Sequence, residues 1–316
     1  MAIKRPFRAV LYRKGGPAVP IEFDDSRVDV GGVDDRRGGI GIGGGGLAIG
    51  GGAGVVGLII YLVMSVLGGG GTGLPLDTGA GPDSSGQQES SEELQQRCNS
   101  EGALDKYTDC RLIKVYNVAD ETWSDEFSRR GLDYSPPRLA FFTQATRTGC
   151  GAASAEVGPF YCPADREIYF ELGFLEQLQQ QFGAQGEFAQ AYIAAHEFGH
   201  HLQTLLGTER QVRSAQGRDS DSANKYSVAL ELQADCYAGV WSKLADQRSQ
   251  GGIALTQDNI AEAVNAAEAV GDDRIQQRTQ GRVDPESWTH GSAEQRKDWF
   301  LRGAQSGNMD ACNTFR

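Results

Sequence analysis

The chain has 316 residues, which is enough for one substantial globular domain with accessory segments. Acidic residues outnumber basic residues by 42 to 30, and the formal net charge is −12 at pH 7. This balance gives no electrostatic support for binding to nucleic acid, so we expect no nucleic-acid partner.

The N-terminal part predicts a membrane anchor. Residues 1–37 carry charges of both signs without apolar periodicity, which indicates a disordered tail. Residues 38–67 contain no charged residue, and their aliphatic part has the ~20-residue length of a transmembrane helix. A cleaved signal peptide is disfavoured, because the polar leader is long and no small-x-small cleavage site follows. Arg36 and Arg37 favour a cytoplasmic N-terminus, so the rest of the chain would lie in the periplasm or outside the cell.

A linker and a cysteine-containing domain follow. Residues 68–96 are rich in glycine, serine and glutamine, which predicts a flexible linker to a domain over residues 97–316. All six cysteines lie in that domain, and an even number in an exported region indicates disulfides. Metal binding by cysteine is disfavoured because no C-x-x-C spacing occurs. Among the ~15 possible pairings we favour Cys98–Cys110, Cys150–Cys162 and Cys236–Cys312.

The first elements of the domain form its core. Residues 104–116 and 119–130 have the amphipathic pattern of helices. Residues 138–143 and 167–170 read as two short strands, separated by a glycine-rich loop that a disulfide can close. A strand beside a metal-binding helix can bind an extended peptide by main-chain pairing. A small structural hairpin is an equally good interpretation.

The pattern H-E-x-x-H follows at residues 196–200. In a helix, His196 and His200 lie one turn apart, so both imidazoles can reach one metal ion. Zinc suits these ligands, and Glu197 would act as general base for a water at the open position. The surrounding helix, residues 188–206, has a wide apolar face, and buried histidines are costly unless a metal satisfies them. A solvated helix with incidental histidines is the alternative, and His201 receives no role.

A second helix supplies two acids. Gly207 ends the first helix, and residues 208–222 predict a polar loop. On the helix predicted over residues 223–245, Glu231 and Asp235 share one face at i, i+4 spacing. We expect Glu231 to be the third zinc ligand and Asp235 to accept the outer N–H of a ligand histidine. A solvated acidic face is the alternative.

The two motifs in combination resemble the gluzincin metallopeptidases, in which H-E-x-x-H is followed by a helix with Glu-x-x-x-Asp. The likeness is closer to the bacterial neutral zinc metallopeptidases and extends over most of the chain. The segments that carry it are Asp34–Gly38, Cys150-Gly151, Gly158–Pro163, Ile168-Tyr169, Ala195–Gln203, Glu231–Gly239 and Thr289–Arg296. One departure is Glu171, because the resemblance implies an aspartate shortly after that strand. The likeness bears on fold and topology more than on substrate.

The C-terminal part adds two candidates through the same resemblance. A third helix is capped at Thr256, and a capping box at Ser292 opens a last helix through Phe300. In the related gluzincins a Thr-His segment and an arginine on the next helix lie at the active site. By that resemblance His290 donates a hydrogen bond to the oxyanion of the reaction, with Arg296 in support. A packed residue before a helix is the alternative for His290.

The predicted fold class is therefore α+β, a mainly helical zincin-like domain with a small sheet, preceded by one transmembrane helix. The predicted function is that of a membrane-anchored zinc metalloendopeptidase acting on peptides or proteins, with Glu197 as base. Two other functions stay open: a non-catalytic zincin-like module for envelope binding or assembly, and a zinc amidase acting on cell-wall peptides. The presence of Glu197 argues against the first of these, because a structural zinc site needs no acid at the open position.

Overall fold

The computed structural model describes residues 20–23, 27–37, 89–175, 186–248 and 253–315. Over these ranges the protein is an α+β domain in which helices predominate. Its α-helices are α2 (Ser91–Cys98), α3 (Ala103–Lys106), α4 (Thr108–Arg129), α6 (Glu187–Leu205), α7 (Thr208–Arg218), α8 (Ala223–Asp246), α9 (Gln257–Ala269), α10 (Asp272–Gln280) and α11 (Ala293–Ser306). Its strands are β1 (Glu22–Phe23), β2 (Val33–Asp35), β3 (Arg138–Phe142), β4 (Ala145–Thr148), β5 (Gly151–Ser154), β6 (Phe160–Cys162), β7 (Glu167–Glu171) and β8 (Ile253–Ala254).

The largest sheet has the strand order β2-β3-β7-β6. Strand β3 pairs in parallel with both β2 and β7, and β6 pairs antiparallel with β7. Nearly every side chain of β3 and β7 is buried, as is typical of parallel strands that are covered on both faces. The strands predicted at residues 138–143 and 167–170 are thus present. They are parallel neighbours, however, and the interpretation as a small hairpin is wrong.

Residues 20–23 and 27–37 belong to the folded domain, which corrects the prediction of a disordered tail for this part of residues 1–37. Strand β1 pairs with β8, and β2 pairs with β3. Arg36 Nη2 lies 2.8 Å from a carboxylate oxygen of Glu167, and Arg37 Nη1 lies 2.7 Å from one of Asp109. Sheet pairing and ion pairs with distant residues thus order a stretch that lacks an apolar pattern of its own.

The carboxylate of Asp109 connects Arg37, before residues 38–88, with the ion pair of Glu89 and Arg97 after them. Asp109 Oδ2 lies 2.7 Å from both Arg37 Nη1 and Arg97 Nη2, and Arg97 pairs with Glu89 at 2.7 Å. Burial alone would raise the pKa of Asp109, but the hydrogen bond from Arg97 and the charge of Arg37 lower it to about 2. Residues 37 and 89 therefore both lie beside this ion-pair network.

The predicted transmembrane segment, residues 38–67, lies outside the described residues. Within the described ranges, no helix has both the length and the apolar character to cross a bilayer. A single crossing through residues 38–67 would place β2 and β3 on opposite sides of a membrane, yet the two strands share a sheet. The predicted separation of a cytoplasmic tail from an exported domain is therefore wrong for residues 27–37.

Three helices occupy segments for which the sequence predicted no helix. Helix α2 begins inside the predicted linker over residues 68–96, where Ser90 and Glu93 form a capping box. Helix α7 replaces the loop predicted over residues 208–222, and α10 was not anticipated. In α7 only Val212 is buried, so this helix has no apolar stripe that a sequence pattern can reveal.

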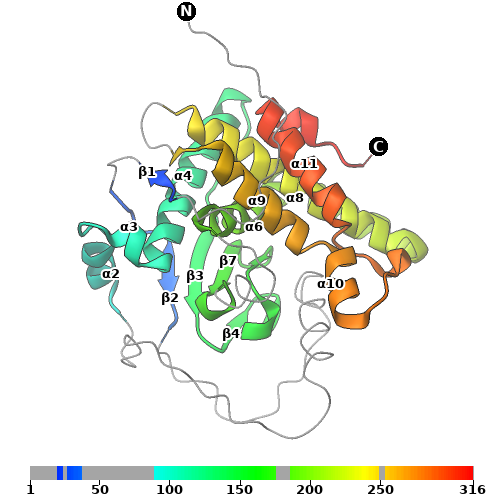
Figure 1. Ribbon diagram of the computed structural model, residues 1–316, viewed down its shortest axis with the longest axis horizontal. Helices are drawn as coiled ribbons and strands as arrows, with labels where there is room; N and C mark the ends of the chain where they lie inside the picture. Colours follow the sequence, from blue (N-terminus) through cyan, green and yellow to red (C-terminus); the bar gives the residue numbers. More distant parts are fainter. Residues whose placement is uncertain (1–19, 24–26, 38–88, 176–185, 249–252, 316) are drawn as a thin grey trace, which may run out of the picture.

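Helix α6 lies at the centre of the domain, between strands β3 and β7 and the helices α8, α9 and α11 (Figure 1). Phe188 of α6 stacks on Trp241 of α8. Gly199 permits the close approach of α6 and α8, because a Cβ there would lie 3.0 Å from the backbone of Ala234. This contact sets the distance between the H-E-x-x-H pattern and the acidic residues of α8.

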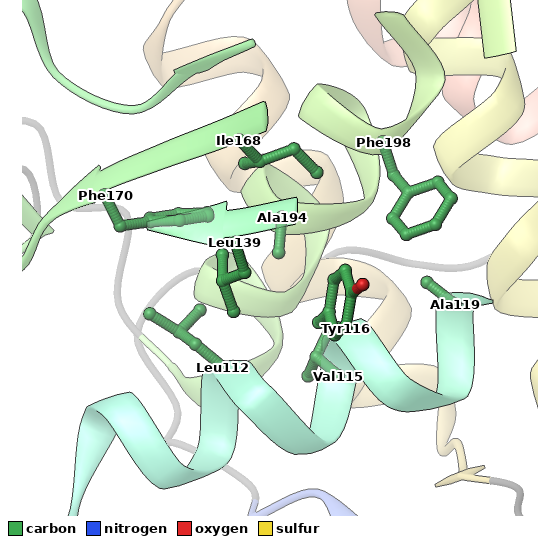
Figure 2. Close-up of a pocket in the computed structure, with 9 residues that line it drawn as sticks. All are labelled: Leu112, Val115, Tyr116, Ala119, Leu139, Ile168, Phe170, Ala194 and Phe198. Carbon is green, nitrogen blue, oxygen red and sulfur yellow. The ribbon is translucent and has the colours of Figure 1, made fainter. Parts of the chain in front are cut away.

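A small cavity lies behind α6 (Figure 2). It has a volume of about 10 Å³ and lies between α4, the sheet and α6. Its lining residues are Leu112, Val115, Tyr116, Ala119, Leu139, Ile168, Phe170, Ala194 and Phe198. The hydroxyl of Tyr116 already donates to the carbonyl of Pro137. A space of this size with an apolar lining holds no stable water, so it is a packing defect and not a binding site.

The three predicted disulfides are confirmed: Cys98–Cys110, Cys150–Cys162 and Cys236–Cys312. They use all six cysteines of the chain. The third bond has a sequence separation of 76 residues and ties the C-terminal segment to α8.

Candidate metal centre

Helix α6 carries the H-E-x-x-H pattern through the interior of the domain. At its N-terminus, Glu262 of α9 accepts a hydrogen bond from the main-chain N–H of Phe188, and a carboxylate is favourable at this end of a helix. Most residues of α6 are buried, as the predicted apolar face requires. The side chains of His196 and His200 are 6% and 14% exposed. They therefore face the interior and not bulk solvent.

The structure brings His196 and His200 together with Glu231 of α8. One possible ligand atom of each side chain lies within 4.8 Å of the others. Nε2 of His196 is 3.2 Å from Oε2 of Glu231, and Nε2 of His200 is 3.5 Å from Oε1. Ligand atoms of a tetrahedral zinc ion lie roughly 3.4 Å apart. The three side chains thus need only small movements to enclose an ion.

Two buried atoms beside this trio have no hydrogen-bond partner among the described residues. They are Nε2 of His200, whose 3.5 Å contact with Glu231 is not a hydrogen bond, and Oε2 of Glu197. Buried polar atoms without a partner are rare and call for a ligand or an ordered water. A metal ion at Nε2 of His200 with a water toward Glu197 satisfies both atoms. Two imidazoles and a carboxylate are also a zinc donor set, so the residues present fit zinc.

Burial and charge act differently on the side chains of this centre. Burial opposes ionisation of Glu231, but the charge of His200 and the hydrogen bond from His196 hold its pKa well below the usual range. For Glu197 burial dominates and raises the pKa, and the histidine charges offset this only in part. Burial lowers the pKa of His196, but Asp235 raises it more, to about 9 in the metal-free protein.

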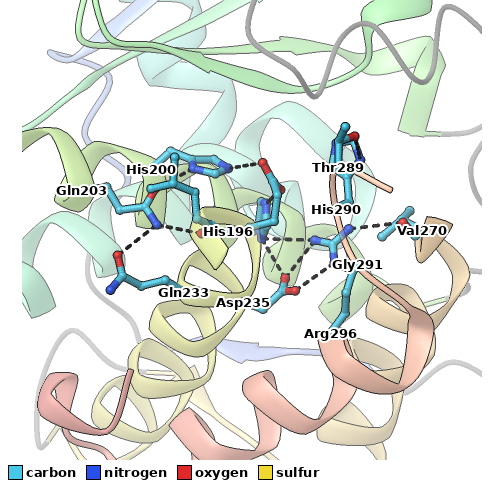
Figure 3. Close-up of polar contacts among 12 residues, drawn as sticks. His196, His200, Gln203, Gln233, Asp235, Val270, Thr289, His290, Gly291 and Arg296 are labelled. Carbon is cyan, nitrogen blue, oxygen red and sulfur yellow. Dashed lines mark hydrogen bonds and ion pairs between the residues drawn. The ribbon is translucent and has the colours of Figure 1, made fainter. Parts of the chain in front are cut away.

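Asp235 lies one turn after Glu231 on α8 and is fully buried behind His196. It accepts a hydrogen bond from His196 Nδ1 at 2.8 Å, and another from the hydroxyl of Tyr192. The predicted contact of Asp235 with a motif histidine is thus present (Figure 3). This contact makes Nδ1 of His196 a donor and leaves Nε2 to face Glu231.

Arg296 of α11 lies at the site, on the side of His196 where Asp235 is found. Its Nε and Nη2 donate to Asp235 at 2.8 and 2.9 Å. Its Nη1 donates to the carbonyl of Val270, and Nη2 also reaches the hydroxyl of Tyr192, both at 3.3 Å. These contacts are all on the Nδ1 side of His196, away from Nε2. Arg296 thus balances the buried charge of Asp235, and its support of an oxyanion stays a prediction.

His290 lies in a turn that a single aspartate organises. Oδ2 of Asp272 accepts from the main-chain N–H groups of Thr289, His290 and Gly291 at 2.7–3.0 Å. Nδ1 of His290 is 3.1 Å from the Thr289 hydroxyl and 3.3 Å from Oδ1 of Asp272. The sequence analysis missed Asp272, because an aspartate in the first turn of a helix such as α10 is common. His290 is 5% exposed, and its charge acts on Glu231.

Two residues singled out by the sequence have structural contacts. His201 is fully buried and lies 3.0 Å from the Tyr161 hydroxyl of β6 and 2.7 Å from the carbonyl of Ser135. Burial lowers the pKa of His201 to about 4, so it is neutral and ties α6 to β6. Glu171, at the departure from the resemblance, accepts a hydrogen bond from the N–H of Phe174 at 2.7 Å.

Gln203 and Gln233 also contact the site, and neither was predicted from the sequence. Nδ1 of His200 lies 2.9 Å from Oε1 of Gln203, and Gln203 contacts Gln233 of α8. A glutamine on a helix usually marks a solvated position, so the sequence carries no signal for this contact.

Comparison with known proteins agrees with this geometry. A family model described as "Putative neutral zinc metallopeptidase" matches residues 25–315, which include strand β2. Uncharacterized protein YpfJ of Escherichia coli K12 is 44% identical over 265 residues, 83% of this chain and 88% of that protein. Uncharacterized protein Rv2575 of Mycobacterium tuberculosis H37Rv is 44% identical over 227 residues, 69% of this chain and 74% of that protein. No solved structure matches. The chain therefore belongs to the neutral zinc metallopeptidase family.

Proposed function

We propose that the protein is a zinc-dependent endopeptidase with a zincin-like site, in which His196, His200 and Glu231 hold the metal. When bound, zinc supplies a Lewis acid that polarises the peptide carbonyl and makes water more acidic. Glu197 takes the proton of the attacking water at Oε2 and then delivers it to the nitrogen of the leaving amine. Its raised pKa suits both transfers.

His290 is the candidate donor to the oxyanion. Asp272 holds the main chain of the turn, so the imidazole has a fixed position. With a proton on each ring nitrogen, Nδ1 donates to Oδ1 of Asp272, and Nε2 can donate to the carbonyl oxygen as its charge develops.

The edge strand β6 is the candidate site for an extended substrate. In the described sheet β6 has a partner on one side only, β7. The hydrogen bond between Tyr161 and His201 holds this strand beside α6. A peptide that adds to the free edge of β6 gains main-chain hydrogen bonds without dependence on its side chains.

One observation carries the proposal: the unpartnered atoms His200 Nε2 and Glu197 Oε2 lie at the trio of possible ligands. A purely structural role for this cluster would not leave a buried carboxylate oxygen and a buried imidazole nitrogen without partners.

Metal content and cleavage of casein by the full-length protein test the proposal. The same measurements are made on Glu197→Gln and on a chelated sample. We expect one zinc per chain in both proteins, cleavage by the unmodified protein only, and loss of cleavage on chelation. Cleavage by Glu197→Gln would refute the assigned base. Zinc without cleavage by the unmodified protein would favour a binding module, and a folded protein that does not bind zinc would end the proposal.

We propose further that the domain lies outside the cytoplasm, because disulfides persist in oxidising compartments. The stretch at residues 38–67 is the candidate membrane contact. Arg37 before it and Glu89 after it both belong to the domain, so the chain would have to enter and leave the bilayer from the same side. Peptide tags at the two chain ends, probed with antibody on intact and permeabilised cells, test this. We expect both tags on one side, and tags on opposite sides would contradict the arrangement.

A further inference from the structure

His200 is connected to the C-terminal segment by a chain of hydrogen bonds between uncharged groups, of which Figure 3 shows the part from His200 to Gln233. Nδ1 of His200 lies 2.9 Å from Oε1 of Gln203. Nε2 of Gln203 donates to Oε1 of Gln233 at 3.2 Å. Nε2 of Gln233 in turn donates to the carbonyl of Cys312 at 3.0 Å. Gln203, Gln233 and Cys312 are at most 6% exposed, so water does not compete for these contacts.

Two main-chain carbonyls determine the direction of the chain. The amide nitrogen of Gln203 also donates to the carbonyl of Leu230 at 2.7 Å, and that of Gln233 donates to Cys312. A carbonyl can only accept, so neither amide can be reversed without placing two oxygens against each other. Oε1 of Gln203 therefore faces His200, whose Nδ1 must donate to it.

Because Nδ1 of His200 donates to Gln203, the other ring nitrogen, Nε2, is available to bind a metal ion. A neutral imidazole that donates through Nδ1 has its lone pair on Nε2, and in His200 that atom has no hydrogen-bond partner in the part of the chain that the structure describes. Nε2 is also the atom that lies 3.5 Å from Glu231. The chain thus holds the ring with its free lone pair directed at the possible metal site.

The last link depends on the C-terminal segment. The carbonyl of Cys312 is held in place by the Cys236–Cys312 disulfide to α8. A second tie follows two residues later, where the Thr314 hydroxyl donates to the carbonyl of Ala229 at 2.6 Å. The C-terminal segment therefore contacts α8 at Ala229, before Glu231 and Gln233, and at Cys236, after them.

We propose that Gln203, Gln233 and the disulfide-anchored carbonyl of Cys312 are positioning groups for His200. Through them the C-terminal segment tunes the affinity of the centre for zinc. The inference rests on the proposed metal site but not on peptidase activity. Loss of an outer hydrogen-bond partner of a ligand histidine typically weakens metal affinity by about 10–100-fold. We expect the loss of uncharged amide partners to weaken it by an amount near the lower end of that range.

The test is zinc affinity, measured by chelator competition on the full chain. Gln233→Leu removes the middle link, and the pair Cys236→Ser with Cys312→Ser releases its anchor. Gln190→Leu is the matched control, because Gln190 is on α6, is as buried as Gln233 and contacts Arg111 instead. The pair Cys98→Ser with Cys110→Ser is the control for the loss of a disulfide. Cobalt substituted for zinc reports the ligand geometry by its visible absorption.

We expect Gln233→Leu and the Cys236/Cys312 variant to bind zinc about tenfold more weakly and to shift the cobalt spectrum, with both controls unchanged. Equal zinc affinity of Gln233→Leu and Gln190→Leu would overturn the inference and leave the proposed function intact. If Gln233→Leu does not fold, the Cys236/Cys312 variant decides. Failure of the unmodified protein to bind zinc would overturn both proposals.

Discussion

The two histidines of the metal centre are supported in opposite ways. Behind His196, the carboxylate of Asp235 is paired with the guanidinium of Arg296, and all three groups are buried. Behind His200, the support is the amide chain through Gln203, which carries no charge. Both imidazoles are thus held through Nδ1. The Nδ1 of His196 contacts a carboxylate that is paired with a guanidinium, whereas the Nδ1 of His200 contacts an uncharged amide.

The difference shows what each kind of support requires. A buried carboxylate stabilises a ligand imidazole strongly but needs a buried cation, because an isolated charge in the interior is costly. An amide needs only acceptors for its N–H groups, and main-chain carbonyls provide them. The charged support depends on Arg296 of α11, whereas the neutral support depends on the fold of the C-terminal segment.

Removal of the carboxylate should produce the largest effect. Asp235→Leu leaves Arg296 buried without its partner, so we expect a loss of about 3–5 kcal/mol in the free energy of unfolding. Urea unfolding of the metal-free protein measures this. The double variant Asp235→Leu with Arg296→Met removes both charges and should recover most of the loss. A double variant as unstable as Asp235→Leu would show that the charge balance is not the cause.

A change of pH should alter the charged support of His196. The pKa of His196 is raised to about 9, so its stabilisation is complete below pH 6.5 and is lost as pH rises through 9. Burial opposes ionisation of Asp235, but Arg296 and His196 lower its pKa to about 2, so its contribution is lost as pH falls below 4 toward 2. Between pH 6.5 and 9 we expect the metal-free protein to lose stability on the order of 2 kcal/mol.

Urea unfolding at pH 6.5 and 9 tests this expectation, with Asp235→Asn as the comparison. The variant lacks the carboxylate that raises the pKa of His196, so its stability should change less over the same interval. Equal slopes in the two proteins would contradict the assignment. Gln233→Leu should keep the slope of the unmodified protein, because its side chain carries no titratable group.

The smallest effect should come from the end of the neutral support. Thr314→Val removes the hydrogen bond to the carbonyl of Ala229 and leaves the shape of the side chain nearly unchanged. We expect a loss of about 1 kcal/mol in the free energy of unfolding and a zinc affinity weakened less than by Gln233→Leu. Denaturation and chelator competition measure the two quantities. A zinc affinity lower than that of Gln233→Leu would place the main anchor at Thr314 and not at the disulfide.

The charged support was accessible to sequence reasoning, and the neutral support was not. Spacing on two helices suffices to predict that His196, Glu231 and Asp235 come together, because i, i+4 positions share a face. Gln203 lies at such a position too, one turn from His200, but an uncharged polar side chain does not signal burial. Arg296 was found through resemblance, and its ion pair with Asp235 was not predicted because this tertiary contact has no local pattern.

The secondary structure, too, could be predicted only where it depends on a local sequence pattern. Helices α6, α8 and α9 follow from apolar periodicity and capping residues, and the predicted bounds agree closely with the structure. Strand β2 has three residues, two of them aspartates, and becomes ordered only through its partner β3. Pairing over such a sequence separation leaves no trace in the local composition.

The ion-pair network around Asp109 has a consequence for the length of the chain. Because Arg37 and Glu89 are held beside the same carboxylate, the domain fixes the distance between the two ends of the intervening segment. The entropy of closing a loop grows only with the logarithm of its length, and a twofold change alters the free energy by about 0.6 kcal/mol. Insertions and deletions within this segment should therefore leave the stability of the metal centre nearly unchanged, so its length is free to vary among relatives.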